Sequence, residues 1–392
     1  MGIARHVAGY AGLLSITCGL AWPLPVMATG LQLGPVEIGG AVRINVLDKS
    51  WETREQRFPR ADYEFDTLRG ELGFDQGRWS GSAQYRLYYY DETDRTTHFL
   101  HHAWLGYQLD EESRIRAGVH KVPFGILPFN SHNYFFSLAY YIGLEDDYDL
   151  GFKYTHESGP WRWDAAYYVA DEGSYHGQSR GSARYSYDVV KSPVSANQEE
   201  HQINVRLGYT LDHDEHAHSE LGLSLQAGQI PNDISGKRGT HVAAAVHWDG
   251  SYGPWSVKLQ SLWYRYNLAN PPGTDDRIVV MGAYDFPYNV AAEGNLHTIG
   301  VSYHWDVNYG WLQGITVYND SSYLVKAEQS FDNSLHNIAG MSLDLSPFFI
   351  YADIAVGKNN AWIGPDFNDA LGNGGTDNEL NTRLNLNVGL YF

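Results

Sequence analysis

Apolar and polar residues alternate along most of this chain, in segments of about ten residues that begin near Val36. The alternation is clearest at the C-terminus, where every second residue from Leu384 to Leu390 is apolar and the residues between them are Asn, Asn and Gly. A period of two with one apolar face is typical of a β-strand that lies between an apolar and an aqueous phase.

The same pattern predicts sixteen strands joined by connections that are alternately short and long. Their predicted ranges are 36–47, 62–74, 79–91, 97–109, 114–121, 148–157, 161–170, 201–211, 219–230, 239–249, 255–267, 295–306, 311–320, 335–345, 347–358 and 380–392. Short connections such as 75–78, 158–160, 250–254, 307–310 and 346–347 carry the Gly, Asp, Asn and Pro residues that tight turns need. We therefore expect an all-β fold, a transmembrane antiparallel β-barrel whose short turns are periplasmic and whose long loops are external.

Aromatic residues cluster at the predicted strand ends. Seven tryptophans flank the short turns, and they are Trp79, Trp161, Trp163, Trp248, Trp255, Trp305 and Trp311. Tyrosines lie at the opposite strand ends, at Tyr88, Tyr89, Tyr90, Tyr264, Tyr266 and Tyr318. We expect these two sets to form two belts at the membrane interfaces, whereas a soluble β-sandwich would bury its tryptophans in mid-strand.

The N-terminus has the features of a secretory signal. A positive region at Arg5 and His6 precedes an apolar run over 7–22, and Val26 and Ala28 are the small residues of a cleavage site. We expect residues 1–28 to be removed and residues 29–392 to form one barrel domain. The only cysteine, Cys18, falls within the signal, which excludes disulfides, thiol catalysis and thiolate metal sites in the remaining chain.

Composition narrows the class of protein further. The mean hydropathy of -0.39 is too polar for a helical membrane protein. The net charge of -19 argues against a nucleic-acid partner. Together with the signal and the strand pattern, these values favour the outer membrane of a Gram-negative bacterium, with membrane lipid and lipopolysaccharide as surroundings.

Charged residues within the strands fall on the polar face. A lipid-facing Arg or Lys at mid-membrane costs about 2–4 kcal/mol, so these side chains should face a wet lumen. The basic ones are Arg43, Arg69, Arg86, Arg114, Arg116, Lys153, Arg162, Arg206, Lys258 and Arg383, and the acidic ones are Glu37, Glu71, Asp164, Glu220 and Asp353. This basic wall either braces the barrel through ion pairs or attracts anionic solutes.

The segment after the fifth predicted strand is unlike a solvated loop. Its start, Lys121-Val122-Pro123-Phe124-Gly125, is apolar, and its end carries Glu145, Asp146, Asp147 and Asp149. Proline and glycine end the strand pairing here, and the apolar start needs burial. We expect residues 121–147 to fold into the lumen, with the four acids facing a basic wall that includes Arg86, Arg114 and Arg116.

Lys121, Pro123, Phe124 and Gly125 resemble the Lys-x-Pro-Phe-Gly element of the Gram-negative porin superfamily, especially phosphate-selective-like porins. The resemblance implies a constriction by the loop after strand five and a homotrimer. The last strand, ending on Phe392, is similar to the strand that the barrel assembly machinery recognises. Phosphate-type porins rely on basic loops, whereas this loop ends in four acids, so phosphate selectivity does not carry over.

Taken together, the sequence predicts a porin that forms a water-filled channel for passive diffusion of small hydrophilic solutes or ions, with weak selectivity. We expect no catalytic residues, no metal and no cofactor. An outer-membrane barrel enzyme such as a lipid hydrolase is an alternative, but the chain lacks Gly-x-Ser-x-Gly and a compact Ser/His/Asp set. A second alternative is a barrel that acts as a scaffold or adhesin without transport. The His-rich stretch 213–218 is expected to be a polar turn rather than a metal site.

Overall fold

The computed structural model describes residues 30–52, 62–90, 93–179, 181–376 and 378–392. The expected signal peptide, residues 1–28 with Cys18, lies outside these ranges. Among the described residues, no helix is long and apolar enough to cross a membrane.

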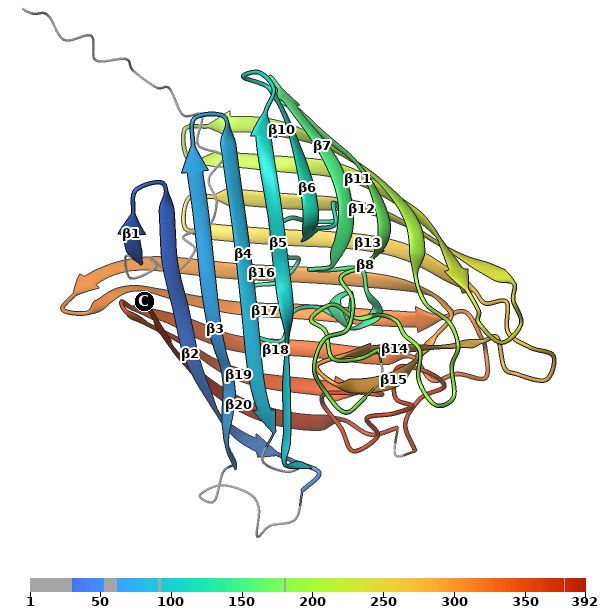
Figure 1. Cartoon of the computed structure of the whole chain (residues 1–392). Coiled ribbons are helices and arrows are strands. Elements are labelled where there is room, and N and C mark those ends of the chain that lie inside the picture. Colours follow the sequence, from blue (N-terminus) through green and yellow to red (C-terminus); the bar gives the residue numbers. More distant parts are fainter. Residues whose placement is uncertain (1–29, 53–61, 91–92, 180, 377) are drawn as a thin grey trace, which may run out of the picture.

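Sixteen antiparallel strands close into a barrel (Figure 1). They are β2 (Val36–Lys49), β3 (Asp62–Gln76), β4 (Trp79–Tyr90), β5 (Arg95–Gln108), β6 (Ser113–Lys121), β7 (Tyr148–Ser158), β8 (Trp161–Asp171), β10 (Glu200–Asp214), β11 (Ala217–Pro231), β12 (Arg238–Tyr252), β13 (Trp255–Asn267), β16 (Glu293–Tyr309), β17 (Leu312–Lys326), β18 (Ser334–Leu345), β19 (Phe348–Lys358) and β20 (Asn381–Tyr391). A short strand β1 (Leu31–Leu33) folds back on β2. The predicted fold and all sixteen predicted strands are confirmed, with ends that differ by a few residues.

The barrel closes where the first long strand meets the last one. β2 pairs with both β3 and β20, from Ala41 opposite Tyr391 to Lys49 opposite Arg383. Gly40 and Phe392 exchange two backbone hydrogen bonds, of 2.7 and 3.0 Å, at the end of this seam. Closure leaves no long unpaired strand edge within the membrane, where unpaired backbone groups are costly.

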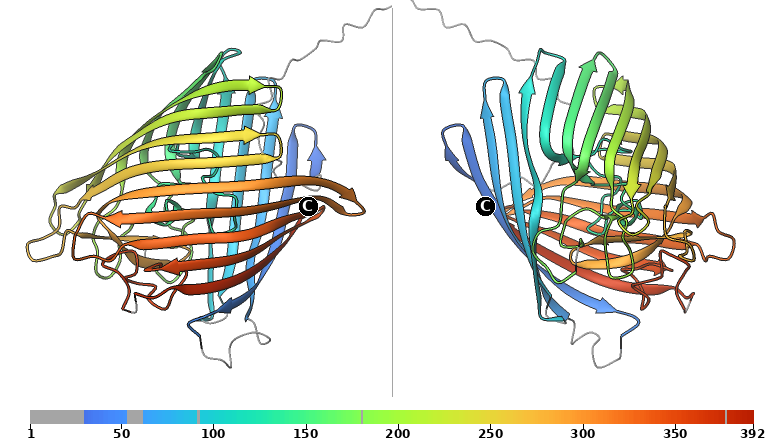
Figure 2. Two further views of the ribbon diagram at one scale, coloured as in Figure 1. Left: turned by 180° about the vertical axis from the view of Figure 1, so that it is seen from behind. Right: turned by 45° about the vertical axis from the view of Figure 1, so that its right-hand side comes forward.

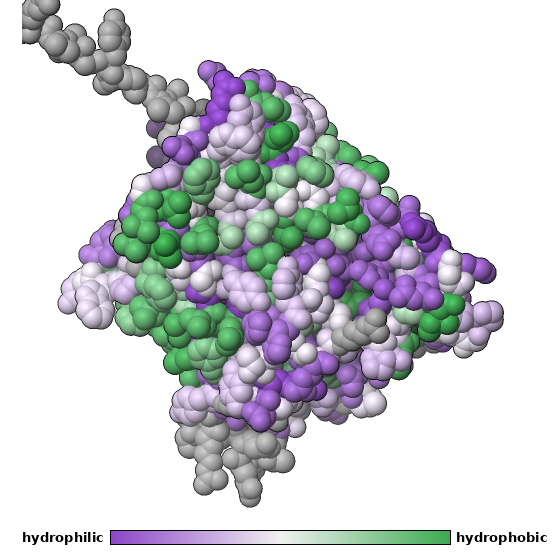
Figure 3. All heavy atoms as spheres, in the orientation of Figure 1, coloured by the Kyte–Doolittle hydropathy of each residue, from purple (hydrophilic) through white to green (hydrophobic). Residues whose placement is uncertain are grey.

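Strand residues alternate between a lumen face and an outer face. In β10, the side chains of Gln202, Asn204 and Arg206 are buried within the barrel, whereas Ile203 and Val205 are 55% and 46% exposed on the outside. Hydrophobic side chains spread over the outer faces of the strands, and hydrophilic ones gather near the strand ends (Figure 3). This arrangement is the reverse of a water-soluble barrel and suits a surface in contact with lipid.

The two predicted aromatic belts have different outcomes. Six of the seven tryptophans, all except Trp248, are exposed near the short turns, as predicted. The tyrosine belt is wrong, because Tyr88, Tyr264, Tyr266 and Tyr318 are at most 6% exposed and point into the barrel. Side chains separated by an even number of residues along a strand point to the same side of the sheet. Tyr88 lies two residues from Arg86 and Tyr264 lies six residues from Lys258, and both of these basic side chains face the lumen.

Three long connections gather at the end of the barrel away from the C-terminus, which we call the loop end (Figure 2). They are residues 172–199, 268–292 and 359–380. The opposite end, with the short turns, is the turn end. Residues 268–292 include the hairpin of β14 (Ile278–Ala283) and β15 (Phe286–Ala291), and β14 also pairs with β9 (Asp188–Val189). The connection between β6 and β7, residues 122–147, takes a different course and is named the inner loop.

Candidate pore constriction and lumen

The inner loop lies inside the barrel, against the lumen faces of β11, β13, β16 and β17. The backbone N–H groups of Gly125 and Ile126 donate to Ser224 Oγ at 3.0 Å and Gln260 Oε1 at 2.9 Å. Further along, Asn130 Nδ2 donates to Thr298 Oγ1 at 3.0 Å, and His132 Nδ1 lies 2.7 Å from Asp320 Oδ1. The loop therefore crosses the lumen wall by hydrogen-bonding to successive strands.

Three basic side chains from the strands hold the loop backbone. Lys153 Nζ donates to the carbonyl of Lys121 at 2.6 Å, Arg206 Nε donates to that of Gly125 at 2.8 Å, and Lys258 Nζ donates to that of Phe129. We call Lys153, Arg206 and Lys258 the loop-holding cations. Because the loop has left the strand ladder, its carbonyls need such donors to avoid being buried unpaired.

The sequence of the loop start explains this path. Val122 and Phe124 are buried, so the apolar side chains at the start of the loop are removed from water. Gly125 has φ +64°, and a Cβ there would lie 2.3 Å from Gln260 Oε1, so this position needs glycine for both its conformation and its close contact. Pro123 has no N–H to donate, which suits the point where strand pairing ends.

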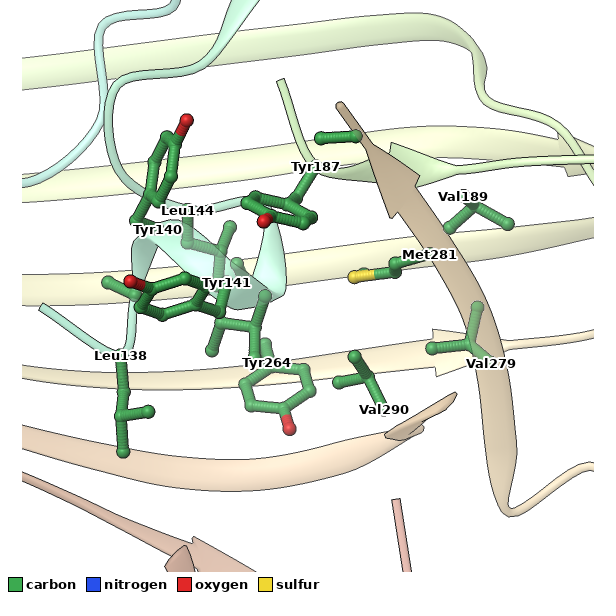
Figure 4. Packing of buried hydrophobic residues seen from close by; sticks show 14 of the residues in the cluster. Leu138, Tyr140, Tyr141, Leu144, Tyr187, Val189, Tyr264, Val279, Met281 and Val290 are labelled. Atoms are coloured by element: carbon green, nitrogen blue, oxygen red, sulfur yellow. The ribbon is translucent and has the colours of Figure 1, made fainter. Parts of the chain in front are cut away.

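The second half of the loop is anchored by aromatic packing. Leu138, Tyr140 and Tyr141 belong to one buried cluster with Tyr187 from residues 172–199, Met281 from β14, Val290 and Tyr264 (Figure 4). The ring of Tyr187 lies 5.1 Å from that of Tyr140 and 5.6 Å from that of Tyr141. Tyr140 and Tyr141 are part of the 3-10 turn Tyr140–Ile142. This part of the lumen is packed with side chains from the inner loop, residues 172–199 and residues 268–292. The inner loop is therefore held by the barrel strands on one side and by this aromatic cluster on the other.

The four acids at the end of the loop have different surroundings. Glu145 is buried within the loop and accepts hydrogen bonds from Asn130 N at 2.9 Å, Ser137 N at 3.1 Å and Ser137 Oγ at 2.5 Å. Burial raises the pKa of Glu145, and the hydrogen bonds from Ser137 and Asn130 act in the opposite direction. Asp147 and Asp149 are buried against residues 172–199. Of the four, only Asp146 borders the larger open space of the lumen, although its side chain is 2% exposed; it pairs with Lys121 Nζ and accepts from Tyr185 Oη at 2.5 Å.

That open space is a cavity of about 670 Å³ beside the inner loop. It extends from Glu37 and Phe392 at the turn end to Tyr187 and Tyr284 at the loop end. Its wall comes from β2–β5, β19 and β20, and inner-loop residues such as Phe136 close the other side. We call it the open cavity.

Four arginines, which we call the cavity arginines, line the open cavity: Arg43, Arg69, Arg86 and Arg383. Each guanidinium lies over an aromatic ring, at 5.7 Å from Tyr134, 4.9 Å from Tyr391, 4.5 Å from Tyr185 and 5.1 Å from Phe135 respectively. Such contacts hold the planar cation in place, while its N–H groups donate to other partners.

The cavity arginines differ in their acidic partners. Arg43 pairs with Asp66 at 2.8 Å and Arg69 pairs with Glu71 at 2.7 Å. Arg86 donates instead to Gln84 Oε1 and Tyr88 Oη, and Arg383 to the carbonyl of Trp362. Within the described ranges neither Arg86 nor Arg383 has a carboxylate within salt-bridge distance, so their charge acts on the cavity.

The remaining predicted wall residues lie near the turn end. Arg114 and Arg162 both pair with Glu157, at 3.0 and 2.9 Å, and Arg116 lies 3.9 Å over the ring of Trp104. The structure therefore does not bring Arg114 and Arg116 to the loop acids. Arg114 and Lys121 are at opposite ends of β6, which separates them by about 23 Å at the usual rise per residue. The alternation along a strand shows whether a side chain faces inward, but it does not show how far along the barrel axis that side chain lies.

Several residues that shape the lumen were missed in the sequence. Tyr185 and Tyr187 come from a loop without strand periodicity, and no local signal marks them as lumen residues. His132 and Asp320 are 188 residues apart and meet only because the loop folds inward. The His-rich stretch is a turn between β10 and β11, where His213 Nε2 lies 2.9 Å from Ser219 Oγ.

Comparison with known proteins identifies the family. The family model for phosphate-selective porin O and P matches residues 52–308. The chain belongs to this porin family. It is an outer-membrane channel for small solutes and not an enzyme. A comparison with curated proteins gives no match for this porin.

Solved structures share the fold of this porin at low sequence identity. The outer membrane channel DcaP of Acinetobacter baumannii is 11% identical with a TM-score of 0.55, over 93% of this chain and 100% of that chain. The anion-selective porin from Comamonas acidovorans is 13% identical with a TM-score of 0.53, over 91% and 99%. OmpF of Salmonella typhi, in complex with daunomycin, is 11% identical with a TM-score of 0.56, over 91% and 97%.

Proposed function

We propose that this porin passes small hydrophilic solutes and ions by passive diffusion through the open cavity, with the inner loop as its constriction. The observation that carries the proposal is the position of the loop. It is hydrogen-bonded across four strands on one side of the lumen and borders the open cavity on the other. A rigid loop in that position sets the width that remains for solutes.

We further propose a weak preference for anions. Arg86 and Arg383 present charge to the cavity without a carboxylate partner, which favours anions. The pairs Arg43–Asp66 and Arg69–Glu71 are close to neutral, and Asp146 is paired with Lys121. Glu37 and Glu64 add negative charge to the cavity wall. Glu37 and Glu64 equal Arg86 and Arg383 in number, so the proposed preference rests on position and is weak. Arg383 lies over Phe135 of the inner loop and Arg86 lies over Tyr185, beside the proposed constriction.

The proposed assembly is a homotrimer in the outer membrane, surrounded by lipid and lipopolysaccharide. OmpT of Vibrio cholerae, which was solved in a trimer form, has a TM-score of 0.56 and 12% identity over 91% of this chain and 99% of that chain. We also propose that Phe392 forms part of the signal for the barrel assembly machinery. Phe392 is 53% exposed at the turn end of the barrel, where another protein could reach it.

Bilayer recording of the purified protein tests this proposal. We expect steady single-channel conductance and a reversal potential, under a KCl gradient, that shows modest anion preference. Folded protein that inserts but does not conduct would contradict the channel route through the open cavity. A cation-selective channel would contradict the role assigned to Arg86 and Arg383.

A further inference from the structure

Three buried aspartates converge at the end of the inner loop. Asp147 is the last residue of that loop, Asp149 is the second residue of β7, and Asp188 begins β9 within residues 172–199. One carboxylate oxygen from each lies within 4.8 Å of those of the other two, and all three side chains are buried. In the part of the chain that the structure describes, no other group of His, Cys, Asp and Glu ligand atoms converges in this way.

The surroundings of this group contain more negative than positive charge. Asp171 and Glu172 lie at the end of β8, and Arg184 pairs with both, at 2.9 and 3.5 Å, as well as with Asp188 at 2.6 Å. Asp149 accepts a hydrogen bond from the neutral Gln202 at 3.2 Å. The single guanidinium of Arg184 is therefore shared among carboxylates and does not balance the group.

One oxygen in the group lacks a donor. Asp147 is 7% exposed, and its Oδ1 is buried without a hydrogen-bond partner among the described residues. A buried carboxylate oxygen without a partner is costly, and its cost is removed either by a proton or by a cation. An oxygen of the same carboxylate lies within 4.8 Å of one oxygen of Asp149 and one of Asp188, so a cation placed between the three would contact this carboxylate.

We propose that Asp147, Asp149 and Asp188 form a Ca²⁺ site that ties the inner loop to residues 172–199. Ca²⁺ takes oxygen ligands at about 2.3–2.6 Å, so two ligands on opposite sides of the ion lie up to about 5 Å apart. The aspartate oxygens all lie within 4.8 Å of one another, so one Ca²⁺ can contact all three. Mg²⁺ usually keeps several of its waters and is seldom held by protein carboxylates alone, and the absence of His and Cys ligands disfavours transition metals.

The charges around the group favour a divalent cation. Of the three aspartates, Arg184 pairs only with Asp188 among the described residues, so a cation between the three carboxylates would supply the missing positive charge. The site does not depend on which solutes the channel passes.

Terbium luminescence and calorimetry on the full-length folded protein test the proposal. After treatment with EDTA, we expect one Ca²⁺ per chain to bind with a Kd of about 0.1–1 mM, the range of extracellular calcium modules. Tb³⁺ should bind at the same site and be excited through nearby tyrosines such as Tyr148 and Tyr168, with Ca²⁺ displacing it. Asp147→Asn and Asp188→Asn should each weaken binding by about tenfold or more, because affinity follows the ligand charge count.

Asp275→Asn is the matched control, since Asp275 lies in an external connection and pairs with Arg277. It should bind Ca²⁺ as the parent does. Heat-modifiable migration establishes that each variant is folded before it is compared. Parent protein that binds no Ca²⁺ at millimolar concentrations would overturn the proposal in favour of a protonated cluster. Binding that Asp147→Asn and Asp188→Asn leave unchanged, or equal affinity for Mg²⁺, would also overturn it.

Discussion

Basic side chains line both sides of this barrel's lumen, but they have different tasks on the two sides. On the packed side, Lys153, Arg206 and Lys258 donate to backbone carbonyls of the inner loop. On the open side, the cavity arginines lie over aromatic rings and face about 670 Å³ of space. The side chains on both sides are basic and face inward, and what differs is the group opposite each of them.

The comparison shows how one porin wall can both position a loop and present charge to solutes. A cation whose donors are used by loop carbonyls contributes to rigidity, and its charge is buried behind the loop. Arg86 and Arg383 are each held by an aromatic ring and donate only to neutral groups among the described residues, so their charge is not cancelled and acts on the cavity. Substitutions on the packed side should therefore change conductance and stability, whereas those on the open side should change ion preference.

Arg206→Met should have the largest effect. Arg206 is 1% exposed, and its removal leaves the carbonyl of Gly125 without this donor and takes from Glu220 one of its two partners, the other being His247 at 3.0 Å. Removing one partner of a fully buried pair costs about 3–5 kcal/mol, and the partly exposed Glu220 places the cost here at or below that range. We expect a lower unfolding temperature and larger, noisier single-channel currents, with partial recovery in Arg206→Met/Glu220→Gln. Quiet currents of parental size would show that the loop does not depend on this contact.

Glu145→Gln should have the next largest effect. Its carboxylate accepts three hydrogen bonds within the inner loop, and an amide cannot accept all of them. Hydrogen bonds to a charged group contribute about 1.5–3 kcal/mol, so we expect current fluctuations as the loop loosens. Asp146→Asn is the matched comparison, because Asp146 faces the cavity: it should shift the reversal potential toward anions without added noise. If the two variants behave alike, the distinction between the two acids is wrong.

Arg86→Gln and Arg383→Gln should change ion preference while leaving stability near the parental value. Both side chains face the cavity without a carboxylate partner among the described residues. We expect each variant to shift the reversal potential toward cations, and the double variant to shift it further, most clearly at low salt where screening is weak. If the double variant has the reversal potential of the parent, Arg86 and Arg383 do not set the ion preference.

Arg114→Gln should have the smallest effect. Arg114 forms a partly exposed pair with Glu157 near the turn end, and pairs of this kind contribute about 0–1 kcal/mol. We expect conductance, reversal potential and unfolding temperature close to those of the parent. A shift as large as that of Arg86→Gln would mean that the turn end, rather than the cavity, sets ion preference.

The sequence allowed the strands and the facing of their side chains to be predicted, because a membrane barrel imposes a period of two on every strand. It also indicated that residues 121–147 fold inward, since Val122 and Phe124 need burial. It did not reveal which cations meet the loop. Arg206 and Arg86 have the same facing, and only their positions around the barrel decide that one meets the Gly125 carbonyl and the other the cavity.

Contacts between loops were beyond sequence reasoning for a different reason. Asp147 and Asp188 meet because two connections fold into the same lumen, and neither connection has a periodic pattern that fixes its path. The buried tyrosines were misplaced because aromatic residues near strand ends suit both a membrane interface and a packed lumen. Parity within each strand, applied to Tyr88 and Tyr264, would have separated the two.

Single-channel conductance after shortening the inner loop tests the central claim, that this loop is the constriction, most directly. Deletion of residues 129–141 removes the segment that borders the open cavity and leaves all sixteen strands intact. For variant protein that still shows heat-modifiable migration, we predict higher conductance than the parent and weaker discrimination between small and large ions. A folded variant with the conductance and size limit of the parent would contradict the claim.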